Sequence, residues 1–253
     1  MGVLDGRVAI VTAAAGVGIG QAVARRFAEE GAQVLLTDAH ARRVQELAEA
    51  MGKDYGREFV GVEVDVTNVG QVQGMVQTAL DRYSQIDILL NNAGINRLEP
   101  VWQMSDETWN LVIGVNLTGT FHCTRAVLPH MIERKKGVII SLASMAGWIG
   151  SDEGEAHYCA AKAGVMAFTR AVAAEVGRHG VRINAIAPGL IYNPFLDRIY
   201  PPEFFQRIAA RTPLGRVGEP PDIANLATFL ASDQSSYITG EVFSISGGLY
   251  MKA

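Results

Sequence analysis

Short apolar segments alternate along the chain with longer amphipathic stretches. Between the short runs, apolar residues recur at helical spacing, and such alternation indicates a parallel sheet covered by helices on both faces. The prediction is one α/β domain, residues 1–253, built on a doubly wound parallel sheet of about seven strands. Strands are predicted over residues 7–12, 33–37, 58–64, 86–90, 137–142, 182–187 and 242–245.

The overall composition narrows the class of protein. With 253 residues, 49% apolar and 19% charged, the chain is predicted to form a compact fold rather than a disordered one. A net charge of -4 without a clustered basic stripe argues against nucleic acid or an anionic membrane as partner. We expect neither a transmembrane segment nor a secretory leader, which favours the cytoplasm. Cys123 and Cys159 lack the spacing of a metal site, and no metal is expected.

The first predicted strand runs into a glycine-rich turn that is followed by a helical pattern. Glycines let a pyrophosphate approach the backbone, and the helix N-terminus offers unpaired N–H groups to the phosphates. The alternative is a tight turn of the kind that any α/β protein contains. The second strand ends at Asp38, about 20 residues beyond the loop, where an acidic side chain would bind ribose hydroxyls. This combination favours a dinucleotide site.

A tyrosine and a lysine lie one helical turn apart in the segment Tyr158-Cys-Ala-Ala-Lys162. On a helix, side chains at this spacing share a face, so an ammonium group can stabilise the phenolate, whose ordinary pKa is about 10. Alone, the pair also occurs on many solvated helices. Ser144 precedes it in the segment Leu142 to Gly147.

Six segments follow one another in the order typical of one family. They are Thr12 to Gly20, Asp65-Val66, Asn91 to Gly94, Asn116, the group Ser144, Tyr158 and Lys162, and Asn184 to Gly189. In these segments the chain resembles the short-chain dehydrogenase/reductase family over nearly its whole length. The resemblance implies a Rossmann-type fold, a nicotinamide coenzyme, oxidoreductase activity and a homotetramer.

The same resemblance implies a role for each site residue. Tyr158 would be the general acid for reduction and the general base for oxidation, and Lys162 would lower its pKa and hold the nicotinamide ribose. Ser144 would orient the substrate oxygen, and Asn116 would help hold a water near Lys162. The implied coenzyme contacts are Gly16, Gly18, Ile19, Gly20, Asp38, Asp65, Val66, Asn92, Ala93, Gly94, Tyr158, Lys162, Pro188, Gly189, Ile191 and Asn193.

Several of these residues also have a purely structural alternative. Ser144 suits a turn, Asn116 suits a bend in a long helix, and Asp65 suits the N-cap of a helix starting near Asn68. The chain also departs from the family pattern. Ala13 stands where the family's first glycine is usual, and one extra residue precedes Gly18, so the phosphate contacts within the loop stay open.

NAD is favoured over NADP. Asp38 would bind the ribose hydroxyls and repel the additional phosphate of NADP, while the loop Ala14 to Val17 carries no basic residue to neutralise it. Arg42 and Arg43 are assigned to a solvated helix face.

The expected substrate is a small hydrophobic alcohol or ketone, such as a steroid-like ring system or a 3-oxoacyl thioester. By resemblance, residues 190–215 form a lid, and they are rich in apolar side chains that either face the substrate or pack against the domain or another subunit. His157, Glu153 and Glu155 either recognise the substrate or belong to a solvated loop. The apolar candidates are Phe195, Leu196, Ile199, Tyr200, Phe204 and Phe205, with Met145, Trp148 and Trp102 as further wall.

The alternative to an enzyme is a catalytically silent nucleotide-binding sensor or scaffold of the same fold. The complete set of Asn116, Ser144, Tyr158 and Lys162 favours the enzyme, because a sensor has no need of a phenol paired with an ammonium group.

Overall fold

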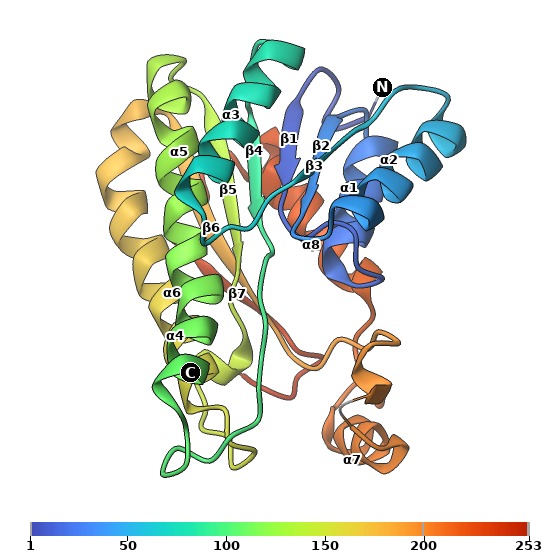
Figure 1. Cartoon of the computed structure of the whole chain (residues 1–253), viewed down its shortest axis with the longest axis vertical. Coiled ribbons are helices and arrows are strands. Elements are labelled where there is room, and N and C mark those ends of the chain that lie inside the picture. Colours follow the sequence, from blue (N-terminus) through green and yellow to red (C-terminus); the bar gives the residue numbers. More distant parts are fainter. Residues whose placement is uncertain (1, 199, 252–253) are drawn as a thin grey trace.

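The computed structural model describes residues 2–198 and 200–251. Its centre is a parallel seven-stranded sheet in the order β3-β2-β1-β4-β5-β6-β7 (Figure 1). The predicted doubly wound α/β sheet is confirmed, and the strand order reverses between β1 and β4, where such sheets bind ligands. The strands are β1 Val8–Val11, β2 Gln33–Asp38, β3 Val60–Glu63, β4 Ile88–Asn91, β5 Gly137–Leu142, β6 Val181–Pro188 and β7 Val242–Ile245.

Helices cover both faces of the sheet. Alternate strand residues supply the two cores: Val11 packs with α1, α2 and α8 on one face, whereas Ile10 packs with α3, α5 and α6 on the other (Figure 1). A π-helical segment, Gly114–Thr118, joins α4 to α5. The helices are α1 Ile19–Glu29, α2 Ala41–Tyr55, α3 Val69–Tyr83, α4 Asp106–Ile113, α5 Gly119–Glu133, α6 Ala156–Val176, α7 Pro202–Arg211 and α8 Pro220–Ala231.

Helix α3 shows how local sequence sets an element boundary. The side chain of Asn68 accepts a hydrogen bond from the N–H of Gln71 and caps the helix. Asp65 instead accepts bonds from the backbone N–H and the hydroxyl of Thr67 at 2.8 and 2.7 Å. The helix-cap alternative for Asp65 was therefore wrong, because the cap lies three residues further on.

The strand bounds differ most from the prediction in β3 and β4. β3 covers only Val60–Glu63 rather than residues 58–64 and pairs with β2 alone, and β4 covers Ile88–Asn91 rather than residues 86–90. β6 pairs on both sides and extends to Pro188. In the described part of the chain, no helix combines the length and apolar character that crossing a bilayer requires.

Helix α7 stands apart from the two helical layers (Figure 1). Each of its residues, Pro202–Arg211, is at least partly exposed. The helix lies inside the predicted lid, residues 190–215, and it borders a large cavity.

Candidate active site

A cavity of about 1020 Å³ opens at the carboxyl ends of β4, β5 and β6. Its lining includes Asn116, Ser144, Tyr158 and Lys162. These four residues come from the π-helical segment, the turn after β5 and the start of α6. The structure therefore brings the predicted catalytic residues to one cavity.

Tyr158 and Lys162 share a face of α6, as their spacing predicts. The Lys162 Nζ atom lies 5.5 Å from the centroid of the Tyr158 ring and donates a hydrogen bond to the Leu142 carbonyl oxygen at 2.7 Å. Lys162 is only 4% exposed, and this burial lowers its pKa from 10.5 to about 8. The ammonium group is therefore held by the backbone, close to the phenol.

The Tyr158 phenol is held in its protonated form. Burial raises its pKa to about 12; a hydrogen bond with Ser144 opposes this rise, and the nearby Glu155 carboxylate adds to it. We expected Lys162 to lower this pKa, but burial dominates and the Lys162 ammonium donates to Leu142. At neutral pH the phenol is consequently a proton donor.

Ser144 lies at the turn that follows β5. Its hydroxyl accepts a hydrogen bond from the N–H of Ala146 at 3.2 Å and caps the short 3₁₀ segment Met145–Gly147. Ser144 also lines the cavity and lies close enough to Tyr158 to lower the pKa of the phenol. Ser144 thus has both the turn position and the position expected of a group that orients substrate.

Asn116 is fully buried in the π-helical segment. Its amide nitrogen donates to the carbonyl oxygens of Ile95 and Val112, whereas its Oδ1 atom has no partner among the described residues. A Cβ atom added to Gly94 would lie 2.7 Å from this Oδ1 and 3.4 Å from Lys162 Nζ, so both atoms border the same small space. Such a π-segment is frequent at functional sites, and an orphaned acceptor beside an ammonium suits the expected bound water.

The glycine loop fits a pyrophosphate. Helix α1 begins after Gly18, and no side chain in the described part of the chain caps it or places an acid in its first turn. Its N–H groups and the positive end of the helix dipole are therefore available to an anion. A Cβ atom at Gly20 would come within 2.4 Å of the Ala13 carbonyl oxygen, so only glycine permits this close approach of loop and helix.

The loop is braced from the neighbouring strand. The amide of Asn92 donates to the carbonyl oxygens of Thr12 and Ala13 at 3.0 and 3.1 Å, and the Thr12 hydroxyl accepts the N–H groups of Asn92 and Ala93. Ala13 adopts φ +50°, a left-handed conformation that favours the glycine usual at this position. The loop accordingly keeps its shape without that glycine, at some cost in strain.

Asp38 ends β2 beside the glycine loop. Its carboxylate accepts the N–H groups of Ala15 at 3.1 Å and His40 at 3.0 Å. Burial raises its pKa, while the bond from Ala15 and the charge of Arg43 oppose that rise. An acidic group is thereby fixed at the loop edge where an adenosine ribose is expected.

Comparison with known proteins decides the family. Residues 13–250 match the protein-family model described as Enoyl-(Acyl carrier protein) reductase. The chain belongs to the short-chain dehydrogenase/reductase family. It is 43% identical, over 97% of both chains, to the (2S)-[(R)-hydroxy(phenyl)methyl]succinyl-CoA dehydrogenase subunit BbsD of Thauera aromatica. It is 39% identical to 3-oxoacyl-[acyl-carrier-protein] reductase FabG of Thermotoga maritima, over 97% of this chain and 98% of that one.

A solved structure of this family superimposes closely. The crystal structure of gox2181 matches with a TM-score of 0.93 and 37% sequence identity, covering 97% of this chain and 96% of that chain.

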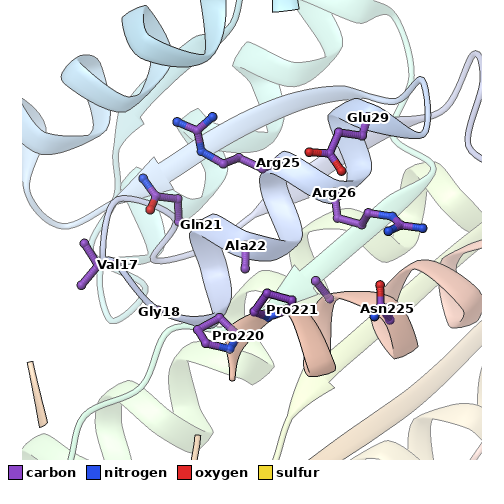
Figure 2. Close-up of a pocket in the computed structure, with 11 residues that line it drawn as sticks. Val17, Gly18, Gln21, Ala22, Arg25, Arg26, Glu29, Pro220, Pro221 and Asn225 are labelled. Atoms are coloured by element: carbon purple, nitrogen blue, oxygen red, sulfur yellow. The ribbon is translucent and has the colours of Figure 1, made fainter. Parts of the chain in front are cut away.

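The coenzyme residues that the family resemblance implies fall into three groups. One group lines the cavity, and Gly18 lines a separate hollow of about 330 Å³ between α1 and α8 (Figure 2). Val66 is buried against Gly119, and Asp65 is exposed. The cavity-lining group is Ile19, Asn92, Gly94, Tyr158, Lys162, Pro188, Gly189, Ile191 and Asn193; outside both linings lie Gly16, Gly20, Asp38, Asp65, Val66 and Ala93.

The predicted lid, residues 190–215, divides its aromatic residues between the cavity and packing. Phe205 packs edge-on against Tyr192, with 5.4 Å between the ring centroids. The predicted lid residue Ile199 lies outside the described residues. Of the further wall residues, Met145 lines the cavity, but Trp148 stacks on Tyr250 and Trp102 is 80% exposed. The lid residues that line the cavity include Phe195, Leu196, Tyr200 and Phe204.

Another part of the cavity wall is built from two loops that are hydrogen-bonded to each other. The N–H of Glu99 donates to the Gly154 carbonyl oxygen at 3.0 Å, and the Asn96 amide donates to the Glu155 carboxylate at 2.5 Å. Glu155 lines the cavity as polar recognition would require. His157 neither lines the cavity nor lies in a solvated loop, the two alternatives expected for it. It is buried at the start of α6, where its Nδ1 atom accepts a hydrogen bond from the N–H of Tyr158.

Sequence reasoning missed part of the cavity lining. Asn96 and Leu98 come from the loop after β4, and Arg207, Ile208 and Arg211 come from α7. The α7 residues could have been predicted from the sequence, because together with Phe204 they recur at helical spacing and so share one face of the helix. Asn96 gives no such signal, since its partner Glu155 is remote in the sequence.

Proposed function

We propose that this protein interconverts a 3-oxoacyl thioester and the corresponding hydroxyacyl thioester, with NAD(H) as coenzyme. The observation that carries the proposal is the protonated Tyr158 phenol, placed beside Ser144 and Lys162 in one cavity that is also lined by apolar residues of segment 190–215. The relatives' names support the substrate class, because they specify a hydroxyacyl-CoA and a 3-oxoacyl carrier protein.

The residues of the chain supply positioning and proton transfer. When bound, a nicotinamide coenzyme supplies the hydride. The Tyr158 hydroxyl donates its proton to the carbonyl oxygen of the substrate, and the Ser144 hydroxyl donates a hydrogen bond to the same oxygen. The Lys162 ammonium stabilises the phenolate that Tyr158 becomes, because the charges attract strongly in a buried site. At neutral pH a phenol with a pKa of about 12 carries its proton, which is the form that a proton donor in reduction requires.

The preference for NAD rests on Asp38. Asp38 is buried, with 8% of the residue exposed, and its carboxylate is fixed by the N–H groups of Ala15 and His40. A ribose diol donates hydrogen bonds to such a group, whereas a phosphate would meet its negative charge.

The test measures turnover of a substrate panel by the loss of NADH absorbance. The panel contains acetoacetyl-CoA, S-acetoacetyl-N-acetylcysteamine, a steroid ketone and crotonyl-CoA. We expect the two acetoacetyl thioesters to be reduced, and Tyr158→Phe to lower kcat by about 10² to 10⁴ with unchanged NADH binding. Tyr237→Phe, on a fully exposed tyrosine, is the matched control. Reduction of crotonyl-CoA alone, or full activity in Tyr158→Phe, would contradict the proposal.

A further inference from the structure

Helix α7 presents two adjacent rows of side chains to the cavity. Phe204 and Ile208 form an apolar row, and Arg207 and Arg211 form a cationic row one turn long. The Arg207 guanidinium also lies 5.3 Å from the centroid of the Phe204 ring. The face of the lid that borders the cavity is therefore apolar along one line and positively charged along the next.

The loop that precedes α6 carries the opposite charge. Asp152, Glu153 and Glu155 line the cavity from this loop, and Glu155 is held by Asn96 close to Tyr158. Glu153 faces Arg207, but the nitrogen and oxygen of the pair are 3.8 Å apart and the Arg207 side chain is 60% exposed. So loose and exposed a pair contributes little, and an incoming anion can replace it.

This difference in charge sets the orientation of a bound substrate in the cavity. An anionic group is repelled from the wall beside Tyr158 and attracted to α7. We propose that Arg207 and Arg211 bind the phosphate of the substrate's phosphopantetheine carrier, while Phe204 and Ile208 contact the chain that leads from it to the reacting ketone. The inference rests on the proposed thioester substrate and adds the groups that select for it.

The chemistry of the side chains suits this ligand. Arginine offers a planar fork of N–H donors that matches two phosphate oxygens, and such charge-assisted bonds are stronger than neutral ones. The phosphopantetheine phosphate is present both in coenzyme A and in an acyl carrier protein. The phosphate is joined to a nucleotide in the first source and to a protein in the second, so a comparison of both carriers distinguishes them.

The experiment compares substrates that share a ketone and differ in phosphate. Wild type, Arg207→Gln, Arg211→Gln and the double variant are assayed with acetoacetyl-CoA, an acetoacetyl carrier protein and S-acetoacetyl-N-acetylcysteamine, which has no phosphate. Arg178→Gln, which removes the same charge from an exposed residue after α6, is the control. KM for NADH is measured in every variant.

We expect the double variant to raise KM about tenfold for a phosphate-bearing thioester, which corresponds to about 1.4 kcal/mol. The kcat value and the KM for S-acetoacetyl-N-acetylcysteamine should stay as in wild type. Raising the salt from 0.05 to about 0.3 M should raise the wild-type KM for the phosphate-bearing substrate and leave that of the double variant nearly constant, because exposed charges are screened. An effect limited to one carrier identifies the source of the phosphate.

Two results would overturn the inference while leaving the proposed function intact. One is an equal rise of KM for thioesters with and without phosphate, which would mean that the arginines only support the lid. The other is a rise of KM for NADH alone, which would assign them to the coenzyme phosphates. If wild type reduces none of the three thioesters, the proposed function itself fails.

Discussion

Replacing Lys162 by methionine should make the protein more stable while removing its activity. The side chain is 4% exposed, and burial lowers its pKa from 10.5 to about 8. At about 1.4 kcal/mol per pH unit, keeping this ammonium charged in the interior costs about 3 kcal/mol at pH 7. The hydrogen bond from Nζ to the Leu142 carbonyl oxygen stabilises the folded state by about 1.5 kcal/mol. We therefore expect Lys162→Met to raise the free energy of unfolding by about 1–2 kcal/mol.

The pH dependence tests the cause of that gain. A lysine with a lowered pKa in the folded state is destabilising below about pH 8, and the penalty disappears as the pH rises from about 8 to 10.5. Urea unfolding of wild type and Lys162→Met at pH 7, 8, 9 and 10 should show a difference that is largest at pH 7 and then shrinks. Tyr158, with a pKa of about 12, stays protonated in the folded protein over this pH range and contributes little to the difference.

Lys53→Met, on the exposed face of α2, is the control and should change stability little at any pH. If Lys162→Met is no more stable than wild type at pH 7, or if its advantage is the same at pH 7 and 10, the burial argument is wrong.

Two further variants test the coenzyme loop. Asp38→Ala should change the ratio of kcat/KM for NADH and NADPH by at least about tenfold towards NADPH, because a fixed negative charge leaves the ribose site; an unchanged ratio would show that other groups set the preference. Ala13→Gly should raise the free energy of unfolding by about 0.5 kcal/mol, because relief of about 1–2 kcal/mol of strain at φ +50° exceeds the entropic cost of glycine; a lower urea midpoint would refute this.

The sheet and the main site positions are predictable because they depend on local pattern. Buried parallel strands are short apolar runs, and the polar residues at their carboxyl ends meet at one edge of the sheet. Ser144 after β5 and Tyr158 at the start of α6 reach the same cavity for this reason. The length of β3 is less predictable, since Phe59 is apolar and buried although it lies outside the pairing with β2.

Other properties depend on contacts that the sequence does not reveal. The pKa of Tyr158 depends on the balance of burial, Ser144 and Glu155. The spacing of Tyr158 and Lys162 reveals only that a cation is near the phenol, and not these other influences. The bond between Asn96 and Glu155 joins two loops that no periodicity relates. The α7 row of Arg207 and Arg211 resembles any solvated helix face until the cavity beside it is known.

The two sides of the cavity differ in how freely evolution can alter them. The wall beside Tyr158 is tied by Asn96 to Glu155, and Gly154 adopts φ +80° with room only for a hydrogen against the Glu99 backbone, so a change there disturbs the catalytic helix. Every residue of helix α7 is at least partly exposed. New substrate ranges can therefore arise by exchange of residues 202–211 as a module, while Asn116, Ser144, Tyr158 and Lys162 stay in place.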